Sequence, residues 1–220
     1  MKAMILAAGR GERMRPLTDT TPKALLMVGG KTLIEHHLES LIAAGIRDIV
    51  INVAWLGGQI MDYLGDGARF GASIQWSDEG DSALETGGGI ARALPLLGSE
   101  PFWIVNGDVF AQCSFNLPQL TPELLGHLLL VPNPDHNQQG DFALVGSRIE
   151  NTGVTMYTYS GIAYLRPDLF IGHAGGKFSL APLLRAAARR GQLGGELMQG
   201  EWTDVGTPAR LQQLTDRLSR

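Results

Sequence analysis

The hydrophobic pattern of the first fifty residues alternates between strand-like and helix-like segments. Residues 3–7, Ala-Met-Ile-Leu-Ala, form an apolar run without alternation, which is typical of a parallel strand covered on both faces. In residues 32–44 apolar side chains recur at helical spacing, and Thr32 with Glu35 can form a capping box at the start. Residues 46–53 are again strongly apolar. This strand–helix–strand order predicts a right-handed crossover and a parallel sheet.

The rest of the chain continues the pattern with a change in its second half. Up to residue 110 the segments still alternate, which predicts helices at 55–64 and 86–94 and strands at 73–76 and 101–105. Beyond it, short strands follow one another, which predicts antiparallel pairing. These later elements are strands at 128–131, 142–145, 147–149 and 155–165, and helices at 180–190 and 207–218. The expected fold is α/β and Rossmann-like, with a mostly parallel central sheet, flanking helices and a small antiparallel extension.

Length and composition limit the possible classes of protein. With 220 residues the chain suits one domain, residues 1–220, and 44% apolar against 18% charged residues excludes extended disorder. A formal net charge of −4 without a basic run argues against nucleic acid as a partner. The single Cys113 cannot form an internal disulfide. No secretory signal or membrane-length apolar run is present, so we expect a cytoplasmic protein without a membrane or an obligate protein partner.

The loop after the first predicted strand carries residues suited to phosphate. Gly9 and Gly11 permit positive φ and close approach, so peptide N–H groups can converge on anionic oxygens. Arg13 can hold two oxygens with its planar guanidinium, and Lys23 adds a mobile positive charge. Either glycine alone is equally typical of an ordinary turn, but the glycines and cations together predict a phosphate-binding loop.

Two better-known glycine motifs do not fit this loop. A dinucleotide motif G-x-G-x-x-G that begins at Gly9 needs a small residue at position 14, where the chain has Met14. A Walker motif that ends at Lys31 needs a glycine at position 25, where the chain has Leu25. Both motifs are therefore excluded.

Two aspartates are suited to a divalent cation. Asp108 follows the strand predicted at 101–105, and ligands of open α/β sheets bind at the carboxyl ends of the strands. Asp204 lies between a short strand and the last helix. Mg²⁺ takes one or two protein carboxylates and completes its shell with waters and phosphate oxygens. Each aspartate alone is also a common turn former, but together with the phosphate loop they predict a magnesium site.

Residues 6–23, with the pattern L-A-A-G-x-G-x-R-x-x-P-x-T-x-x-x-P-K, resemble the signature of the sugar-1-phosphate nucleotidylyltransferases. The resemblance implies a GT-A-like nucleotidyltransferase fold, with residues 1–110 mainly for the nucleotide and residues 111–220 mainly for the sugar phosphate. It implies that Gly11, Glu12 and Arg13 line the nucleotide phosphates, and that Lys23 neutralises charge near the reacting α-phosphate. Lys23, Arg13 and Asp108 are then the expected catalytic residues.

The resemblance also assigns the base, metal and sugar contacts. Residues 84–90, L-E-T-G-G-G-I, resemble the nucleobase loop, although Glu85 replaces a glycine there, and Gly80 and Gly87 are the candidates for base recognition through the backbone. Asp108 and Asp204 would jointly hold Mg²⁺. The sugar phosphate would contact Asp141 and a pocket lined by Thr158, Tyr159, Ser160 and Gly161.

Within this family the motifs are most similar to the compact uridylyltransferases that act on N-acetyl-α-muramic acid 1-phosphate in peptidoglycan recycling. This implies UTP and that sugar 1-phosphate as substrates. The attacking phosphate is already anionic near neutral pH, so no general base is expected. Arg148, Arg166 and Lys177 are the cations left open for the lactyl carboxylate. A mannose- or glucose-1-phosphate nucleotidylyltransferase, and a noncatalytic nucleotide-sugar sensor of the same fold, remain the alternatives.

Overall fold

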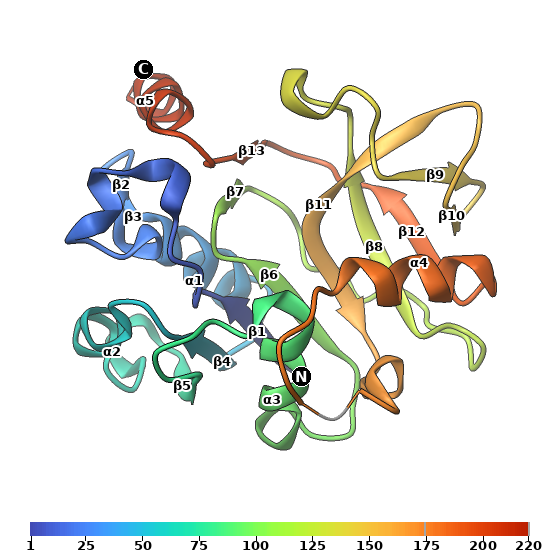
Figure 1. The fold of residues 1–220 in the computed structure, drawn as a ribbon, viewed down its shortest axis with the longest axis horizontal. Helices are drawn as coiled ribbons and strands as arrows, with labels where there is room; N and C mark the ends of the chain where they lie inside the picture. The colour runs from blue at the N-terminus through green and yellow to red at the C-terminus, as the bar shows by residue number, and fades with distance from the viewer. Residues whose placement is uncertain (174, 220) are drawn as a thin grey trace.

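The computed structural model describes residues 1–173 and 175–219, and its centre is a nine-stranded sheet with the order β5-β4-β1-β6-β11-β8-β12-β10-β9. In Figure 1 the sheet strands of residues 1–106 lie on one side of the molecule and those of residues 126–197 on the other. Both halves therefore contribute to the same sheet.

The first half of the sheet is parallel. Strand β1 (Lys2–Leu6) lies between β4 (Asp48–Val53) and β6 (Phe102–Asn106), and β5 (Ser73–Asp78) pairs with β4 at the edge. The connecting helices are α1 (Leu33–Ala43), α2 (Gly57–Leu64) and α3 (Glu85–Leu97). The predicted parallel α/β arrangement is confirmed here.

The second half is mainly antiparallel and continues from β6. The strands are β8 (Gly126–Val131), β9 (Phe142–Val145), β10 (Arg148–Glu150), β11 (Met156–Leu165) and β12 (Leu193–Leu197). Only β12 and β8 pair in parallel among them. The sequence did not predict β12, because Leu-Gly-Gly-Glu-Leu has few strand-forming side chains and is held by its neighbours on both sides.

Two short strand pairs lie outside the main sheet. Strands β2 (Met27–Val28) and β3 (Lys31–Thr32) form a hairpin whose turn residues, Gly29 and Gly30, have φ of 56° and 85°. Strand β7 (Val109–Ala111) pairs with β13 (Trp202–Asp204). The last helices are α4 (Ala181–Arg189) and α5 (Pro208–Leu218), and α5 packs beside the hairpin (Figure 1). Short 3-10 turns occupy Glu12–Met14, Leu17–Asp19, Lys23–Leu25, Ala68–Phe70, Asp135–Asn137 and Pro167–Phe170.

The sheet buries apolar side chains on both faces. Ala3 and Ile5 of β1 belong to one core, whereas Met4 between them belongs to the core on the opposite face. Side chains of a strand alternate between faces, so this distribution explains why the strand has no polar alternation. Among the described residues, no helix has both the length and the apolar character that crossing a membrane requires.

The capping box predicted at the start of α1 is confirmed. Thr32 Oγ1 accepts from the Glu35 N–H at 3.3 Å, and Glu35 Oε2 accepts from the Thr32 N–H at 2.7 Å. Burial raises the pKa of Glu35, but the hydrogen bonds from Thr32 and Tyr63 and the charge of Arg69 together outweigh it, and the pKa is lowered overall.

We expect Thr32→Ala to lower the free energy of unfolding by about 1 kcal/mol, because the helix loses its cap. Urea denaturation measures this, with the exposed Thr152→Ala as the control. A carboxylate with a lowered pKa stabilises the folded state above its unfolded pKa and loses this effect as the pH falls. The difference between Thr32→Ala and the wild type should therefore shrink in acid, and a difference that is constant with pH would contradict this.

Candidate active site

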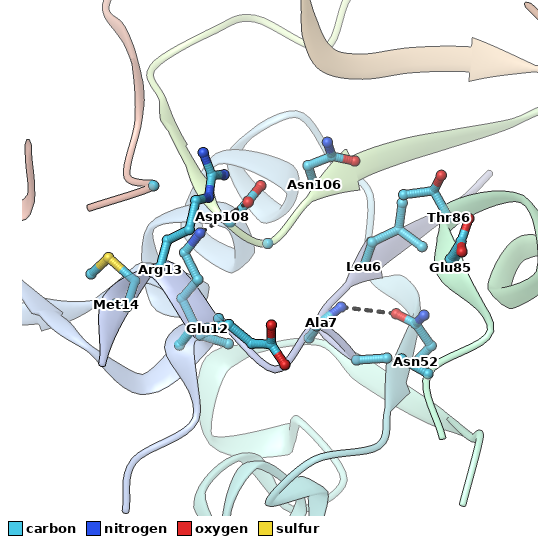
Figure 2. Close-up of a pocket in the computed structure, with 18 of the residues that line it drawn as sticks. Leu6, Ala7, Glu12, Arg13, Met14, Asn52, Glu85, Thr86, Asn106 and Asp108 are labelled. Atoms are coloured by element: carbon cyan, nitrogen blue, oxygen red, sulfur yellow. Dashed lines mark hydrogen bonds and ion pairs between the residues drawn. The ribbon is translucent and has the colours of Figure 1, made fainter. Parts of the chain in front are cut away.

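A cavity of about 420 Å³ lies outside the carboxyl ends of β1, β4 and β6 (Figure 2). Leu6, Asn52 and Asn106 stand at or next to the ends of these strands and line it. This is the edge at which open α/β sheets bind their ligands. The predicted phosphate loop forms one wall, through Gly9, Gly11, Glu12, Arg13 and Lys23.

The loop is held in shape by short internal contacts. Gly11 has φ 66°, and the hydroxyl of Thr18 donates to its carbonyl at 2.8 Å. A methyl group at Gly11 would lie 3.0 Å from Thr18 Cγ2 and 3.3 Å from Lys23 Cβ. Glycine is therefore required by both the backbone conformation and the space. The 3-10 turn that follows places Glu12 and Arg13 at the cavity and buries Met14.

Lys23 and Asp108 form an ion pair at the cavity. Lys23 Nζ lies 2.9 Å from Asp108 Oδ2, and the side chains are 9% and 42% exposed respectively. A buried ammonium needs such a partner. The pair joins the phosphate loop to the end of β6, and both residues line the same cavity as Arg13. Figure 2 shows Asp108 beside Arg13.

Asp204 lies next to Asp108 although the two are far apart in the sequence. In the β7–β13 pair Asp204 stands opposite Val109, and the Val205 N–H donates to the Asp108 carbonyl at 2.9 Å. Both aspartates line a second cavity of about 310 Å³. The structure thus brings the two predicted metal ligands to one place.

The residues at this place fit a hard divalent cation. Asp204 Oδ1 is buried and has no hydrogen-bond partner among the described residues, so it keeps its lone pairs for a cation. Asp108 is partly exposed and supplies a second carboxylate. The described residues contain no group of three or more His, Cys, Asp and Glu side chains arranged as a metal cage. An ion held by these two aspartates would take its other ligands from water and phosphate, as Mg²⁺ prefers.

Sequence analysis missed two side chains that contact Asp204. Arg210 Nη1 and His136 Nε2 lie 3.3 Å and 3.0 Å from Asp204 Oδ2. Arg13 is close as well, since a methyl group at Gly206 would lie 3.2 Å from Arg13 Nη2 and 2.7 Å from Asp204 Oδ1. Arg210 follows the capping residue Thr207 by three positions on α5. That spacing alone does not show which way the side chain points.

The second cavity meets the first at Asn106 and Asp108, which line both. Four of the predicted sugar contacts line it, namely Thr158, Tyr159, Ser160 and Gly161.

Asp141, the fifth predicted sugar contact, is not among the residues that line either cavity. Its carboxylate accepts from the Tyr159 N–H at 2.8 Å and from Asn137 Nδ2 at 3.2 Å. In this structure Asp141 therefore supports the cavity wall, because its carboxylate is engaged by the chain itself.

The base contacts predicted at Gly80 and Gly87 remain a prediction. Gly80 and Gly87 are not among the cavity-lining residues, whereas Ala83, Glu85 and Thr86 are. A methyl group at Gly87 would clash with the Phe178 ring, so this glycine allows close packing of the chain on itself. The hydroxyl of Thr86 accepts from the Leu180 N–H at 3.0 Å. A contact between distant segments determines both roles, and the local sequence does not reveal it.

Two buried titratable side chains near the site carry no charge at neutral pH. Burial lowers the pKa of His37 to about 4, although the Val109 carbonyl and the Asp108 carboxylate oppose this. Burial also raises the pKa of Tyr159. Among the described residues, Arg13 and Lys23 are the arginine and lysine that line the larger cavity, and Arg210 lies beside the smaller one through its contact with Asp204.

Comparisons with known proteins agree with this geometry. A family model described as nucleotidyl transferase matches residues 2–121, and the chain belongs to this family of enzymes. Over 97% of its length the chain is 52% identical to N-acetylmuramate alpha-1-phosphate uridylyltransferase of Neisseria meningitidis, of which it covers 96%. It is 35% identical to the protein of the same name from Caulobacter vibrioides, with 94% of this chain and 92% of the relative covered.

More distant relatives share the fold. The catalytic subunit beta of mannose-1-phosphate guanylyltransferase from Danio rerio is 30% identical, with 94% of this chain and 62% of the relative covered. A crystal structure of a putative glucose-1-phosphate thymidylyltransferase from Bacillus anthracis has a TM-score of 0.85 at 24% identity, and covers 100% of this chain and 95% of that one. The predicted Rossmann-like α/β fold is confirmed.

We expect Lys23→Gln to weaken binding of inorganic triphosphate about tenfold or more, because the cavity loses a charge-assisted hydrogen-bond donor. Isothermal titration calorimetry measures the dissociation constant. Lys31→Gln is the matched control, since Lys31 pairs with Glu39 and is 48% exposed. An equal loss in both variants would contradict a specific role of Lys23.

Proposed function

We propose that the chain transfers UMP from UTP to N-acetyl-α-muramic acid 1-phosphate and releases pyrophosphate. An oxygen of the sugar phosphate attacks the α-phosphorus of UTP. The new P–O bond forms while the bond to the oxygen that bridges the α- and β-phosphates breaks, and pyrophosphate leaves with that oxygen. The attacking phosphate is anionic near neutral pH, so the reaction needs alignment and charge neutralisation rather than a general base.

The observation that carries this proposal is the junction of the two cavities. The larger one holds the phosphate loop and the smaller one the predicted sugar contacts, and Asn106 and Asp108 line both. A nucleotide in the first and a sugar phosphate in the second would meet at these residues. Two anions repel each other there, and Arg13 and Lys23 reduce that repulsion.

Asp108 and Asp204 are the proposed ligands of Mg²⁺. The ion, when bound, supplies positive charge to the phosphate oxygens of both substrates. Lys23 pairs with Asp108, and Arg210 with Asp204, so each carboxylate is held in place by a cation of the chain. Arg13 and Lys23 act on the nucleotide phosphates, and Thr158 to Gly161 form the wall against the sugar.

The choice of sugar is supported by the names of the two uridylyltransferase relatives. Of the three cations left open for the lactyl carboxylate, Arg166 donates to the carbonyls of Leu124 and Leu120, and Arg148 donates to that of Gly191. Lys177 is 65% exposed and lies 4.0 Å from Glu85, which lines the larger cavity. Lys177 thus lies by the cavity proposed for the nucleotide, and the cation for the lactyl carboxylate stays open among these three.

The proposed setting is peptidoglycan recycling in the cytoplasm, where UTP is made. The first uridylyltransferase relative and the single cysteine support it. The guanylyltransferase relatives keep mannose 1-phosphate with GTP as the alternative substrate pair.

Pyrophosphate release over a matrix of nucleotides and sugar phosphates tests the proposal. The matrix combines UTP, GTP and dTTP with the 1-phosphates of N-acetylmuramic acid, N-acetylglucosamine, mannose and glucose. We expect the highest kcat/KM for UTP with N-acetylmuramic acid 1-phosphate. A preference for GTP with mannose 1-phosphate would overturn the assignment, and UTP binding without turnover on any sugar would indicate a sensor.

We expect Asp108→Asn to keep the fold but to lose at least about a hundredfold in magnesium-dependent kcat, because the cation loses a charged ligand. Circular dichroism checks the fold, and pyrophosphate release as a function of Mg²⁺ concentration checks the role. Asp81→Asn, an exposed aspartate outside both cavities, is the control. Unchanged turnover in Asp108→Asn would remove this residue from the mechanism.

A further inference from the structure

A buried chain of hydrogen bonds crosses the base of the larger cavity. Asn52 Oδ1 accepts from the Ala7 N–H at 2.8 Å (Figure 2), and Asn52 Nδ2 donates to Glu79 Oε1 at 2.7 Å. Glu79 Oε2 then accepts from the Leu84 N–H at 2.6 Å. Asn52 and Glu79 are only 2% and 9% exposed, and both line the cavity. These three hydrogen bonds join the start of the phosphate loop to the segment that leads into α3.

The order of donors and acceptors in these hydrogen bonds permits only two combinations of side chains at positions 52 and 79. Both ends are backbone N–H donors, from Ala7 and Leu84, so positions 52 and 79 must each present an acceptor outward. Between them one side chain must donate and the other accept. One amide and one carboxylate satisfy this, as Asn52 and Glu79 do. Two amides place a donor against a donor, and two carboxylates place an acceptor against an acceptor.

We propose that Asn52 and Glu79 are positioning residues that set the spacing of the two walls around the nucleotide, and that UTP affinity depends on the polarity of their hydrogen bonds. The two ends of this series of hydrogen bonds belong to two walls of the cavity. One wall, at the Ala7 end, contains Ala7, Ala8 and Gly9. The other, at the Leu84 end, contains Ala83, Glu85 and Thr86. A buried donor or acceptor without a partner is unfavourable, so a broken link shifts one wall relative to the other. This inference rests on the proposed function, because it takes UTP as the ligand of this cavity.

Gly89 of α3 gives independent support. A methyl group at this position would lie 2.5 Å from Glu79 Oε1 and 2.8 Å from Asn52 Nδ2, which is too close for both. The helix thus packs its backbone directly against the middle of the chain of hydrogen bonds. A larger residue at position 89 would separate Asn52 from Glu79 without removing any polar group.

The test exchanges the two functional groups. Asn52→Asp and Glu79→Gln each break one link, whereas the double variant N52D/E79Q restores all three with the amide and the carboxylate interchanged. We expect each single variant to raise the dissociation constant of UTP about tenfold or more and the double variant to stay within about threefold of the wild type. The KM of the sugar 1-phosphate at saturating UTP should change less than about twofold in all three.

Gly89→Ala should raise the dissociation constant of UTP in the same way, with Gly58→Ala in α2, where nothing lies within 4 Å, as the steric control. All measurements are made below the melting temperature of the least stable variant, which circular dichroism determines.

The outcomes separate this inference from a purely structural role and from the proposed function. Loss of UTP affinity in the single variants with rescue in the double variant supports it. Single variants that bind UTP normally, a double variant that is not rescued, or a rescue seen only in the melting temperature would overturn it. A wild-type chain that does not bind UTP would contradict the proposed function itself, and this inference with it.

Discussion

The site depends on the pairing of β7 with β13. Each strand has only three residues, Val109–Ala111 and Trp202–Asp204, yet their pairing fixes Asp204 beside Val109 and bonds Val205 to the Asp108 carbonyl. So short a pair is not stable alone. It is held because β7 continues from the central strand β6 and β13 leads directly into α5. Two carboxylates from the two halves of the chain therefore meet at the carboxyl edge of the sheet.

A small apolar core lies behind this pairing and supports the charged residues. It joins Met14 of the phosphate loop, Val28 of the hairpin, Phe110 of β7, and Val205 and Leu214 beside and on α5. Three of these side chains lie one or two positions along the chain from a charged residue of the site. Met14 follows Arg13, Phe110 follows Asp108 by two positions, and Val205 follows Asp204. Buried apolar side chains are close-packed, so they fix the position of the backbone that carries these charged residues. Helix α5 is thus part of the site through packing as well as through Arg210.

The protein as a whole is negatively charged, whereas three cationic side chains gather at its site. The formal net charge is −4, but Arg13, Lys23 and Arg210 converge where Asp108 and Asp204 stand. In the described residues each aspartate is paired with a cation, which stabilises a partly buried carboxylate. The proposed triphosphate and Mg²⁺ would find cations and carboxylates already side by side here.

Local sequence determined most of the elements and the phosphate loop, because apolar periodicity, the cap at Thr32 and the spacing from Gly11 to Lys23 act within a few turns of chain. It did not determine β12, the packing of Gly87, or the partners of Asp141, since these follow from contacts with distant segments. The sequence by itself supplied residue types that are suited to phosphate and a divalent ion. Only the tertiary structure decided that Asn52 meets Glu79 and that Asp204 meets Arg210, because a polar side chain's role depends on the partner that packing brings to it.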